Sequence, residues 1–500
     1  NQKSLKYYSH QMNTNNQIQS PILDQSNKQE DFRNQIQAKL SNQLNNGSQI
    51  VLMLNLVLPQ LIALLVEVFG NYLSLYYQIK FFGSEYYKAA LLYVSFIALL
   101  SKNFSQAIAQ KHAITIAEMI KKNVSSELVQ EAFSYHFKTQ FVVGIILSII
   151  GISISFSLTD FPVYSMSMKV SAIFVPFCSA LSNSYSIVFL IENRRLLMFG
   201  LTVSRPIIQA FIELFIYSFY INSTFPDSNQ PTTIGIILSY VCVATWIVWF
   251  NHGKSLLGVT NLEQFPNLQF WDWDLKKLLY SVQLLPAMIN GLNQALYYLA
   301  VMMIEQNINY FTDETLKLQM VYQVFTFVYF GQIFKAAPVA CNSLYTMMAV
   351  NNQTSPNYSR INTTKVVTVF SSAVFNILLY LLMDQVRMPF LMSNNEVRSI
   401  DYATALLYSA ITGFGQTITE ISITQNLIDR KWVEMISMPT IKLIQIIFTR
   451  NYMISLQNSA DYVMMLFYTE LNSVGTGLLS QINDIAVNYV KARKRQKKEM

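Results

Sequence analysis

The sequence has 500 residues, of which 52% are hydrophobic and only 13% are charged. Soluble proteins carry about 25% charged residues, and half of that charge is too little to cover the surface of a soluble particle of this length. These figures exclude a soluble enzyme and favour a polytopic membrane protein. The net charge of +7 is typical of basic cytoplasmic loops, so we expect contact with the lipid bilayer and none with nucleic acid.

The cysteines and histidines predict neither a metal site nor a disulfide framework. The three cysteines lie far apart in apolar runs, and the four histidines do not cluster in the sequence. The chain also has no Gly-rich phosphate loop and no local nucleophile motif. We therefore expect no enzymatic activity, no cofactor and no bound metal.

Two polar segments flank the apolar part of the chain. Residues 1–48 contain 18 Asn or Gln and no apolar run, which predicts a disordered cytoplasmic tail. This segment lacks the features of a secretory signal or a transit peptide, so we expect the plasma membrane or an endomembrane rather than the mitochondrial inner membrane. Residues 491–500 form a second, basic tail.

Between the tails, apolar stretches of about 20 or more residues recur, which is the length needed to cross the hydrocarbon core as a helix. They predict an all-α membrane protein with about twelve transmembrane helices. The expected spans are 49–78, 88–112, 139–160, 166–192, 196–222, 233–252, 278–306, 315–349, 364–386, 399–427, 433–456 and 460–489.

Charge in the short loops sets the orientation of such a protein. If residues 1–48 are cytoplasmic, the loops on that side carry 13 Lys or Arg and those on the other side carry 7. Both ends of the chain are therefore expected on the cytoplasmic side.

The two halves of the apolar region resemble each other. Pro59 opens the first span and Pro286 opens the seventh, 227 residues later, and the order Phe-x-Gln recurs at Phe104 and Phe330. A basic turn followed by a proline also recurs in both halves. These matches predict two pseudo-symmetric six-helix lobes, an N-lobe over 49–256 and a C-lobe over 278–490, joined by a loop over 257–277. Such repeats place a substrate site between the lobes.

In these features the chain resembles the multidrug and toxic compound extrusion (MATE) family, within a superfamily that also contains lipid-linked sugar flippases. The resemblance rests on Pro59, Pro286, the Ala89–Ala90 pair after the first loop and the basic turns. It implies a secondary transporter that moves small organic solutes by alternating access, with H⁺ or Na⁺ antiport. The carboxylates that the family uses in helices 7 and 1 are replaced here by Gln294, Leu299 and Ser74.

Ionisable residues inside a membrane are expensive, which makes them candidates for function. Glu67 lies in the middle of the first span and Glu213 in the fifth. Either acid can take part in proton coupling or form a structural hydrogen bond, and an ion pair between Arg205 and Glu213 is equally consistent with the sequence. For Lys102 we expect a side chain that snorkels to the interface.

Further candidates lie in the second half. Glu420 stands within a polar stripe of Thr and Ser residues, which either lines a cavity or joins helices. Lys335 can neutralise an acid or attract an anionic group. The seventh span carries polar residues on one face, which is either a cavity wall or a packing surface: Asn290, Asn293, Gln294 and Tyr297.

Two other functions fit the same fold. A transport-inactive structural subunit of a larger membrane complex would account for the missing carboxylates and for the Asn/Gln-rich tail, and it would have membrane-protein partners. A lipid-linked sugar flippase would require a basic cavity, for which Lys335 and Arg205 are candidates.

Overall fold

The structure of the protein is a computed structural model. It describes residues 46–82, 99–122, 124, 126–157, 166–191, 195–220, 230–251, 284–292, 295–296, 327, 331–352, 358–391, 402–453 and 474–486, with positions 42, 44, 464, 467, 468 and 471. The regular structure in these residues is helical throughout.

Among the described residues, six long helices come from the first half of the chain and four from the second. The first six are α2 (Gln49–Phe82), α4 (Ser101–Lys121), α5 (Ser126–Ser157), α6 (Met166–Ile191), α7 (Arg195–Tyr220) and α8 (Gln230–Asn251). The other four are α12 (Gly331–Asn352), α13 (Tyr358–Leu391), α14 (Tyr402–Asp429) and α15 (Trp432–Met453). Shorter helical stretches cover 284–292 and 474–486.

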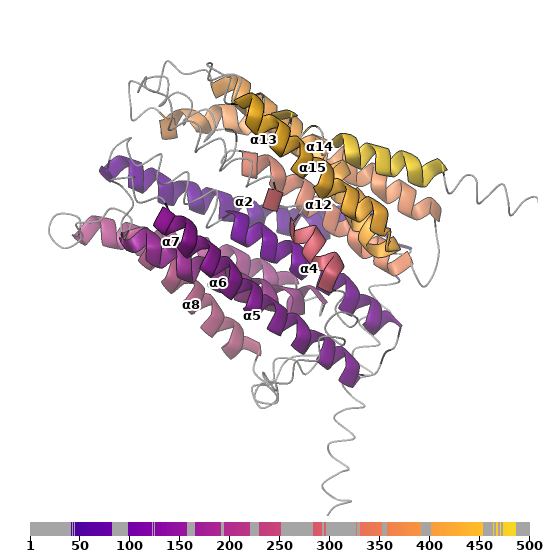
Figure 1. The fold of residues 1–500 in the computed structure, drawn as a ribbon, viewed down its shortest axis with the longest axis horizontal. Coiled ribbons are helices and arrows are strands. Elements are labelled where there is room, and N and C mark those ends of the chain that lie inside the picture. Colours follow the sequence, from indigo (N-terminus) through magenta and orange to yellow (C-terminus); the bar gives the residue numbers. More distant parts are fainter. Residues whose placement is uncertain are drawn as a thin grey trace, which may run out of the picture.

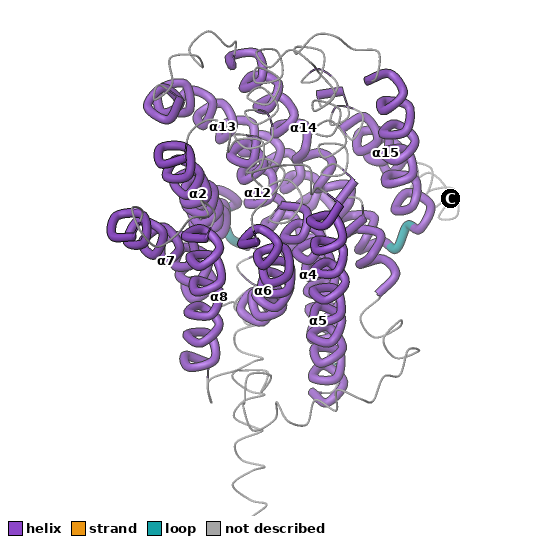
Figure 2. The backbone as a smooth tube through the Cα atoms, turned by 60° about the vertical axis from the view of Figure 1, so that its left-hand side comes forward, coloured by secondary structure: helices purple, strands orange, loops and turns teal. Residues whose placement is uncertain are grey.

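The two halves of the chain form two neighbouring groups of helices (Figure 1). In the first half, α5 packs on α6, and α7 packs on both α2 and α8. In the second half, α12 packs on α13 and α14. The main contact between the groups is made by α12 against α2, with a smaller one against α4, and Figure 2 shows α2 and α4 facing the second group.

The helices follow the predicted spans in order, and the all-α fold is confirmed. Several predicted boundaries are wrong, however. The second span was expected to end at 112, whereas α4 continues to Lys121, and α5 begins at Ser126 instead of 139. Both extensions carry polar and charged residues among buried apolar ones, so a hydropathy window cuts them off although tertiary contacts keep them helical.

Helix α13 shows how the helices meet the lipid. Its large apolar side chains are exposed at intervals of three or four residues, on one face: Val366, Phe370, Val374, Ile377 and Leu381. Its opposite face buries polar side chains at intervals of four: Thr364, Thr368, Ser372 and Asn376. Polar groups inside and apolar groups outside are the arrangement expected in lipid. Within the described residues, four helices are long and apolar enough to cross a membrane: those containing Gln49–Asn71, Glu131–Ser153, Phe199–Phe219 and Ser359–Met383.

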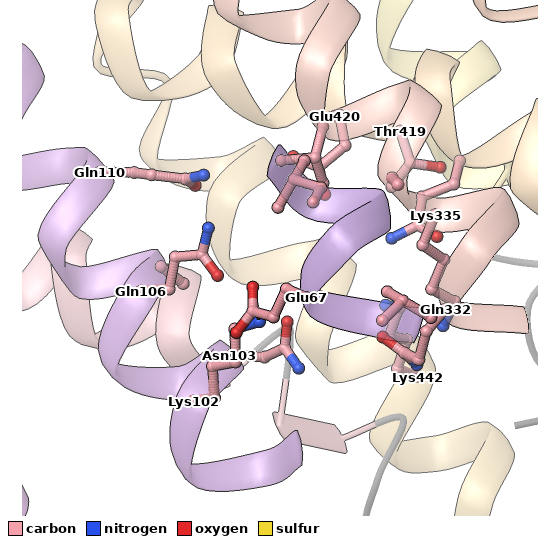
Figure 3. Close-up of a pocket in the computed structure, with 16 residues that line it drawn as sticks. Glu67, Lys102, Asn103, Gln106, Gln110, Gln332, Lys335, Thr419, Glu420 and Lys442 are labelled. Atoms are coloured by element: carbon pink, nitrogen blue, oxygen red, sulfur yellow. The ribbon is translucent and has the colours of Figure 1, made fainter. Parts of the chain in front are cut away.

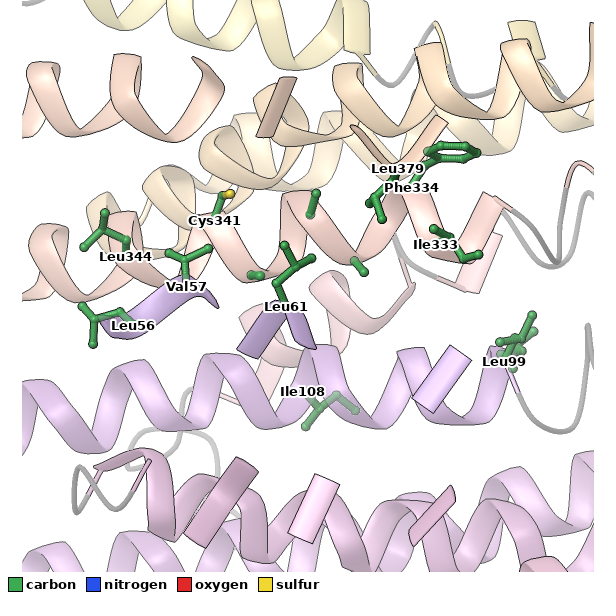
Figure 4. Close-up of a cluster of buried hydrophobic side chains, with 14 of the residues drawn as sticks. Leu56, Val57, Leu61, Leu99, Ile108, Ile333, Phe334, Cys341, Leu344 and Leu379 are labelled. Carbon is green, nitrogen blue, oxygen red and sulfur yellow. The ribbon is translucent and has the colours of Figure 1, made fainter. Parts of the chain in front are cut away.

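Part of the contact between the two groups is an apolar core (Figure 4). Val57 and Leu61 of α2 are buried in one cluster with Cys341 and Leu344 of α12 and with Ile108 of α4. In lipid, tight van der Waals packing rather than the hydrophobic effect holds such helices together. This core fixes the position of α2 between the two groups, and α2 carries Glu67.

The turn between α14 and α15 is tight. Arg430 has a φ of 55°, and the amide of Lys431 donates to the carbonyl oxygen of Asn426 over 3.0 Å, which is the hydrogen bond of a Schellman helix end. Lys431 also forms an ion pair with the buried Asp484. The basic turn predicted here therefore attaches the stretch 474–486 to the bundle.

Candidate functional site

A polar pocket lies where the two groups of helices meet, and we call it the central pocket (Figure 3). Its lining comes from α2, α4, α12, α14 and α15, with a cavity volume of about 80 Å³. The charged residues in the lining are Glu67, Lys102, Lys335, Glu420 and Lys442, and the amides are Asn103, Gln106, Gln110, Gln332 and Gln416. Lipid-embedded helices place so many polar groups together only where they pair with one another or contact water.

Glu67 has two cationic partners. Its Oε2 lies 2.6 Å from Lys102 Nζ, and its Oε1 lies 3.0 Å from Arg205 Nη2. The carboxylate of α2 is thus held by one cation from α4 and one from α7. The expectation that Lys102 snorkels to the interface is wrong, because its ammonium group pairs with the buried carboxylate of Glu67.

The ion pair continues into the first group of helices as a chain of hydrogen bonds. Arg205 Nη1 donates to Gln209 Oε1 over 3.0 Å, and Gln209 Nε2 donates to Glu213 Oε1 over 2.8 Å. Glu213 is fully buried and packs against Gly235 of α8, where a Cβ atom would lie 2.7 Å from Glu213 Cγ. Arg205 therefore reaches Glu213 through Gln209, and its direct ion pair is with Glu67. Glu213 lines neither of the pockets described here.

A second pocket, the first-half pocket, lies on the other side of Glu67. It is lined by α2, α4, α6, α7 and α8, with Met347 of α12, and has a cavity volume of about 170 Å³. Leu64, Glu67, Lys102 and Gln106 line both pockets. The pair of Glu67 and Lys102 is thus the wall between them. Pro59, which was expected to open the first span, lies inside α2 and also lines the first-half pocket.

Towards one end of the bundle, the central pocket is closed by contacts across the two groups, which we call the closing layer. Lys111 of α4, 1% exposed, donates to the carbonyl oxygen of Leu427 of α14 over 2.8 Å. Asn290 Nδ2 donates to the carbonyl oxygen of Ala107 over 3.0 Å. One turn further along α4, Ile114 is buried with apolar residues of the second half, namely Tyr345, Ala349, Ile421 and Ile428. This is the end at which the sequence predicts the cytoplasm.

The polar stripe around Glu420 divides between the two roles considered for it. Thr419 and Glu420 line the central pocket. Thr417 and Thr424 instead bind side chains of neighbouring helices, Ser372 at 2.6 Å and Asn342 at 3.0 Å. Only one face of this stretch of α14 is therefore part of the site.

The other predicted site residues have different outcomes. Glu67, Lys335 and Glu420 lie together in the central pocket, whereas Asn290 lies in the closing layer. Asn293, Gln294 and Tyr297 lie outside the described residues. Sequence reasoning did not find Lys442, Lys111 or the glutamines of α4 and α12; the spacing of Asn103, Gln106 and Gln110 at i, i+3 and i+7 along one face of α4 was the available signal.

Two histidines that are 24 residues apart in the sequence meet in the structure. Nδ1 of His112 lies 2.6 Å from Nδ1 of His136, and both rings are fully buried between α4 and α5. One imidazole must donate and the other accept. The described residues contain no group of three or more His, Cys, Asp or Glu suited to a metal ion, and the three cysteines are free thiols.

The sequence matches no family model and no curated protein, but the structure is similar to solved transporters. An outward-facing multidrug resistance MATE transporter of the MOP superfamily gives a TM-score of 0.63 at 11% identity, covering 89% of this chain and 98% of that one. A MATE transporter from Vibrio cholerae gives 0.64 at 12% identity, over 90% and 98%.

A third similar structure is a MOP superfamily transporter from Pyrococcus furiosus, described as having a binding pocket of reverse polarity. It gives a TM-score of 0.64 at 13% identity, over 89% of this chain and 98% of that one. At these identities the likeness shows the fold. The chain therefore has the all-helical fold of MATE transporters.

Proposed function

We propose that this protein is a secondary transporter that moves small organic solutes across a membrane by alternating access at the central pocket. The observation that carries the proposal is a polar pocket between two groups of helices, closed towards one end by contacts that cross from one group to the other. In this proposal the groups are two lobes, 49–256 and 278–490. A rocking motion of the lobes opens the closing layer and closes the other end.

The fold supports this proposal, since the similar structures are MATE and MOP superfamily transporters. One of them is described as having reverse polarity of its binding pocket, so transporters of this fold differ in the charge of the solute site. Coupling to H⁺ or Na⁺ is proposed at Glu67 or Glu420, the two carboxylates of the central pocket.

The alternative of a transport-inactive structural subunit is less well supported. A scaffold has no need for charged residues in its core, because buried ion pairs contribute little to stability compared with apolar packing. Here five charged side chains surround the central pocket. Purification in mild detergent separates the two proposals, since a scaffold is expected to co-purify with stoichiometric membrane partners.

The test is solute flux in proteoliposomes containing the purified full-length chain, with an imposed proton or sodium gradient. A pair of small aromatic ions of opposite charge serves as the solutes. We expect gradient-dependent flux of at least one of them, and loss of the gradient dependence in the variant in which both carboxylates are neutralised, Glu67→Gln with Glu420→Gln. Absence of flux for both ions, in protein that elutes as a single monodisperse peak, would contradict the proposal.

A further inference from the structure

We infer that the transported solute is an organic anion whose acidic group binds Lys102 and Arg205 in place of Glu67. This inference rests on the proposed function and names the class of its substrate. It comes from the charges of the two pockets and from the position of Glu67 in the wall between them.

The charged residues that line the two pockets are predominantly cationic. Lys102, Lys335, Lys442 and Arg205 face Glu67 and Glu420, so four positive charges accompany two negative ones. In a low-dielectric site this excess repels a cation and attracts an anion more strongly than it would in water. Organic cations are therefore disfavoured in these pockets.

Glu67 occupies the place that an anionic ligand would take. Its carboxylate is bound by two cations from different helices, at 2.6 Å and 3.0 Å, and its side chain is 9% exposed. The solute's acidic group needs the same two donors. When the acidic group of the solute displaces the Glu67 carboxylate, α2, α4 and α7 stay in place, because only the Glu67 side chain has to rotate away.

The guanidinium of Arg205 is held independently of Glu67. It donates to Gln209 over 3.0 Å and lies 5.1 Å from the centre of the Tyr240 ring. Arg205 therefore keeps its orientation when the Glu67 carboxylate leaves, and this preorganisation lowers the cost of binding. Lys102 lines both pockets, so an anion can reach it from the central pocket.

The first-half pocket suits the rest of such a molecule. Its walls combine apolar side chains, among them Phe199, Leu201 and Val243, with the amides of Asn55 and Gln60. A mostly apolar wall with a few fixed polar groups is typical of sites for small organic ligands. The geometry points to an amphipathic monoanion, an apolar body carrying one carboxylate or sulfonate.

The experiment compares two probes with the same body and opposite permanent charge, 2-naphthalenesulfonate and N,N,N-trimethyl-2-naphthylammonium. Their affinities are measured by titration of the full-length protein in nanodiscs. We expect the sulfonate to bind at least tenfold more tightly than the ammonium. The sulfonate affinity should rise several-fold in Glu67→Gln, which removes the competing carboxylate, and fall at least tenfold in Lys102→Gln and Arg205→Gln.

Two further variants guard against misfolding and non-specific charge effects. Lys122→Gln removes a cation at the C-cap of α4, where the side chain is 55% exposed, and should leave the affinity unchanged. The double variant Glu67→Gln with Lys102→Gln removes both charges of the ion pair between the two pockets. It should bind the sulfonate less tightly than Glu67→Gln alone.

Any of three results would overturn the inference: tighter binding of the ammonium than of the sulfonate, binding of neither probe, or an unchanged sulfonate affinity in Glu67→Gln. Flux in proteoliposomes separates it from the proposed function. Gradient-driven flux of the ammonium without flux of the sulfonate would contradict the inference that the solute is an anion, but it would still support the proposed transport function. Flux of neither ion would contradict the proposed transport function itself.

Discussion

Lys111 of α4 donates a hydrogen bond to the main-chain carbonyl oxygen of Leu427 of α14, over 2.8 Å. The two residues belong to different halves of the chain, and Lys111 is 1% exposed. The acceptor lies in the last turn of α14, where unpaired carbonyl groups and the helix dipole both favour a cation. Of the two hydrogen bonds named in the closing layer, this is the one with a charged donor.

We expect Lys111→Met to weaken the closing layer. A hydrogen bond from a charged donor contributes roughly 1.5–3 kcal/mol, so its loss should shift the ratio of open to closed forms about tenfold or more. The measurement is the distance between spin labels on cysteines introduced at Leu128 and Val433. Both residues are exposed, and they lie near the starts of α5 and α15, in different halves.

The labelled protein carries alanine in place of its three cysteines, Cys178, Cys242 and Cys341. Lys122→Met serves as the control, since Lys122 lies at the end of the same helix and is exposed. A longer inter-label distance in both variants, or in neither, would show that Lys111 does not hold the closing layer.

Two glycines allow a matched test of helix packing. At Gly413 of α14, an added Cβ would lie 2.6 Å from Phe334 Cβ and 2.8 Å from the Phe334 carbonyl oxygen of α12. We expect Gly413→Ala to destabilise the protein by about 1–3 kcal/mol through overpacking. At Gly200 of α7 nothing lies within 4 Å, so Gly200→Ala should stabilise by roughly 0.5–1 kcal/mol.

Thermal unfolding in detergent compares the two glycine variants. We expect the midpoint to fall for Gly413→Ala and to rise slightly for Gly200→Ala. Equal changes in both would mean that α12 and α14 do not approach each other as closely as the structure shows.

Arg360 anchors the residues before α2. Its guanidinium donates to the carbonyl oxygens of Leu44 and Gly47, at 2.6 Å and 2.5 Å. Because a planar guanidinium reaches two acceptors in a fixed geometry and an ammonium does not, we expect Arg360→Lys to be a poor substitute. Hydrogen exchange at residues 46–52 should accelerate in Arg360→Lys nearly as much as in Arg360→Met, and full protection in Arg360→Lys would contradict the bidentate contact.

The sequence predicted the all-α fold and the order of the described helices, because lipid requires long apolar helices. It also singled out Glu67, since a carboxylate in the middle of an apolar span stands out. The partners of Glu67 could not be predicted, because Arg205 is 138 residues away and many folds satisfy the same periodicity. The bond from Lys111 was hidden for another reason: its acceptor is a main-chain carbonyl, which every residue carries.

The binding competition at Glu67 predicts how protons and solute are coupled. Protonation neutralises Glu67 and frees Lys102 and Arg205, so a proton and an anion bind together rather than in exchange. Tyr240, Lys335 and Glu420 line the same two pockets as Glu67, and Glu213 lies beyond Arg205 and Gln209. We therefore expect co-transport of one proton with one sulfonate, instead of the antiport implied by the resemblance.

One-to-one co-transport of a proton with a monoanion is electroneutral, which gives a sharp expectation. Sulfonate should accumulate in proteoliposomes about tenfold for each pH unit by which the outside is more acidic, since one unit corresponds to about 1.36 kcal/mol. An imposed membrane potential should have no effect. In Glu67→Gln the pH dependence should disappear and the potential should begin to drive the flux. Accumulation of the sulfonate inside the vesicles when the inside is more acidic than the outside would instead indicate antiport.

Access to the central pocket from both sides of the membrane is the most direct test of alternating access. Gln106→Cys, in the protein without its native cysteines, places a thiol in the wall shared by both pockets. A membrane-impermeant thiol reagent is applied to one side of sealed vesicles and then, in a separate sample, to the other. We predict labelling from either side, with Ala337→Cys, a fully buried position in α12, left unlabelled. Labelling from one side only, with solute and ion gradients varied in both directions, would contradict the account.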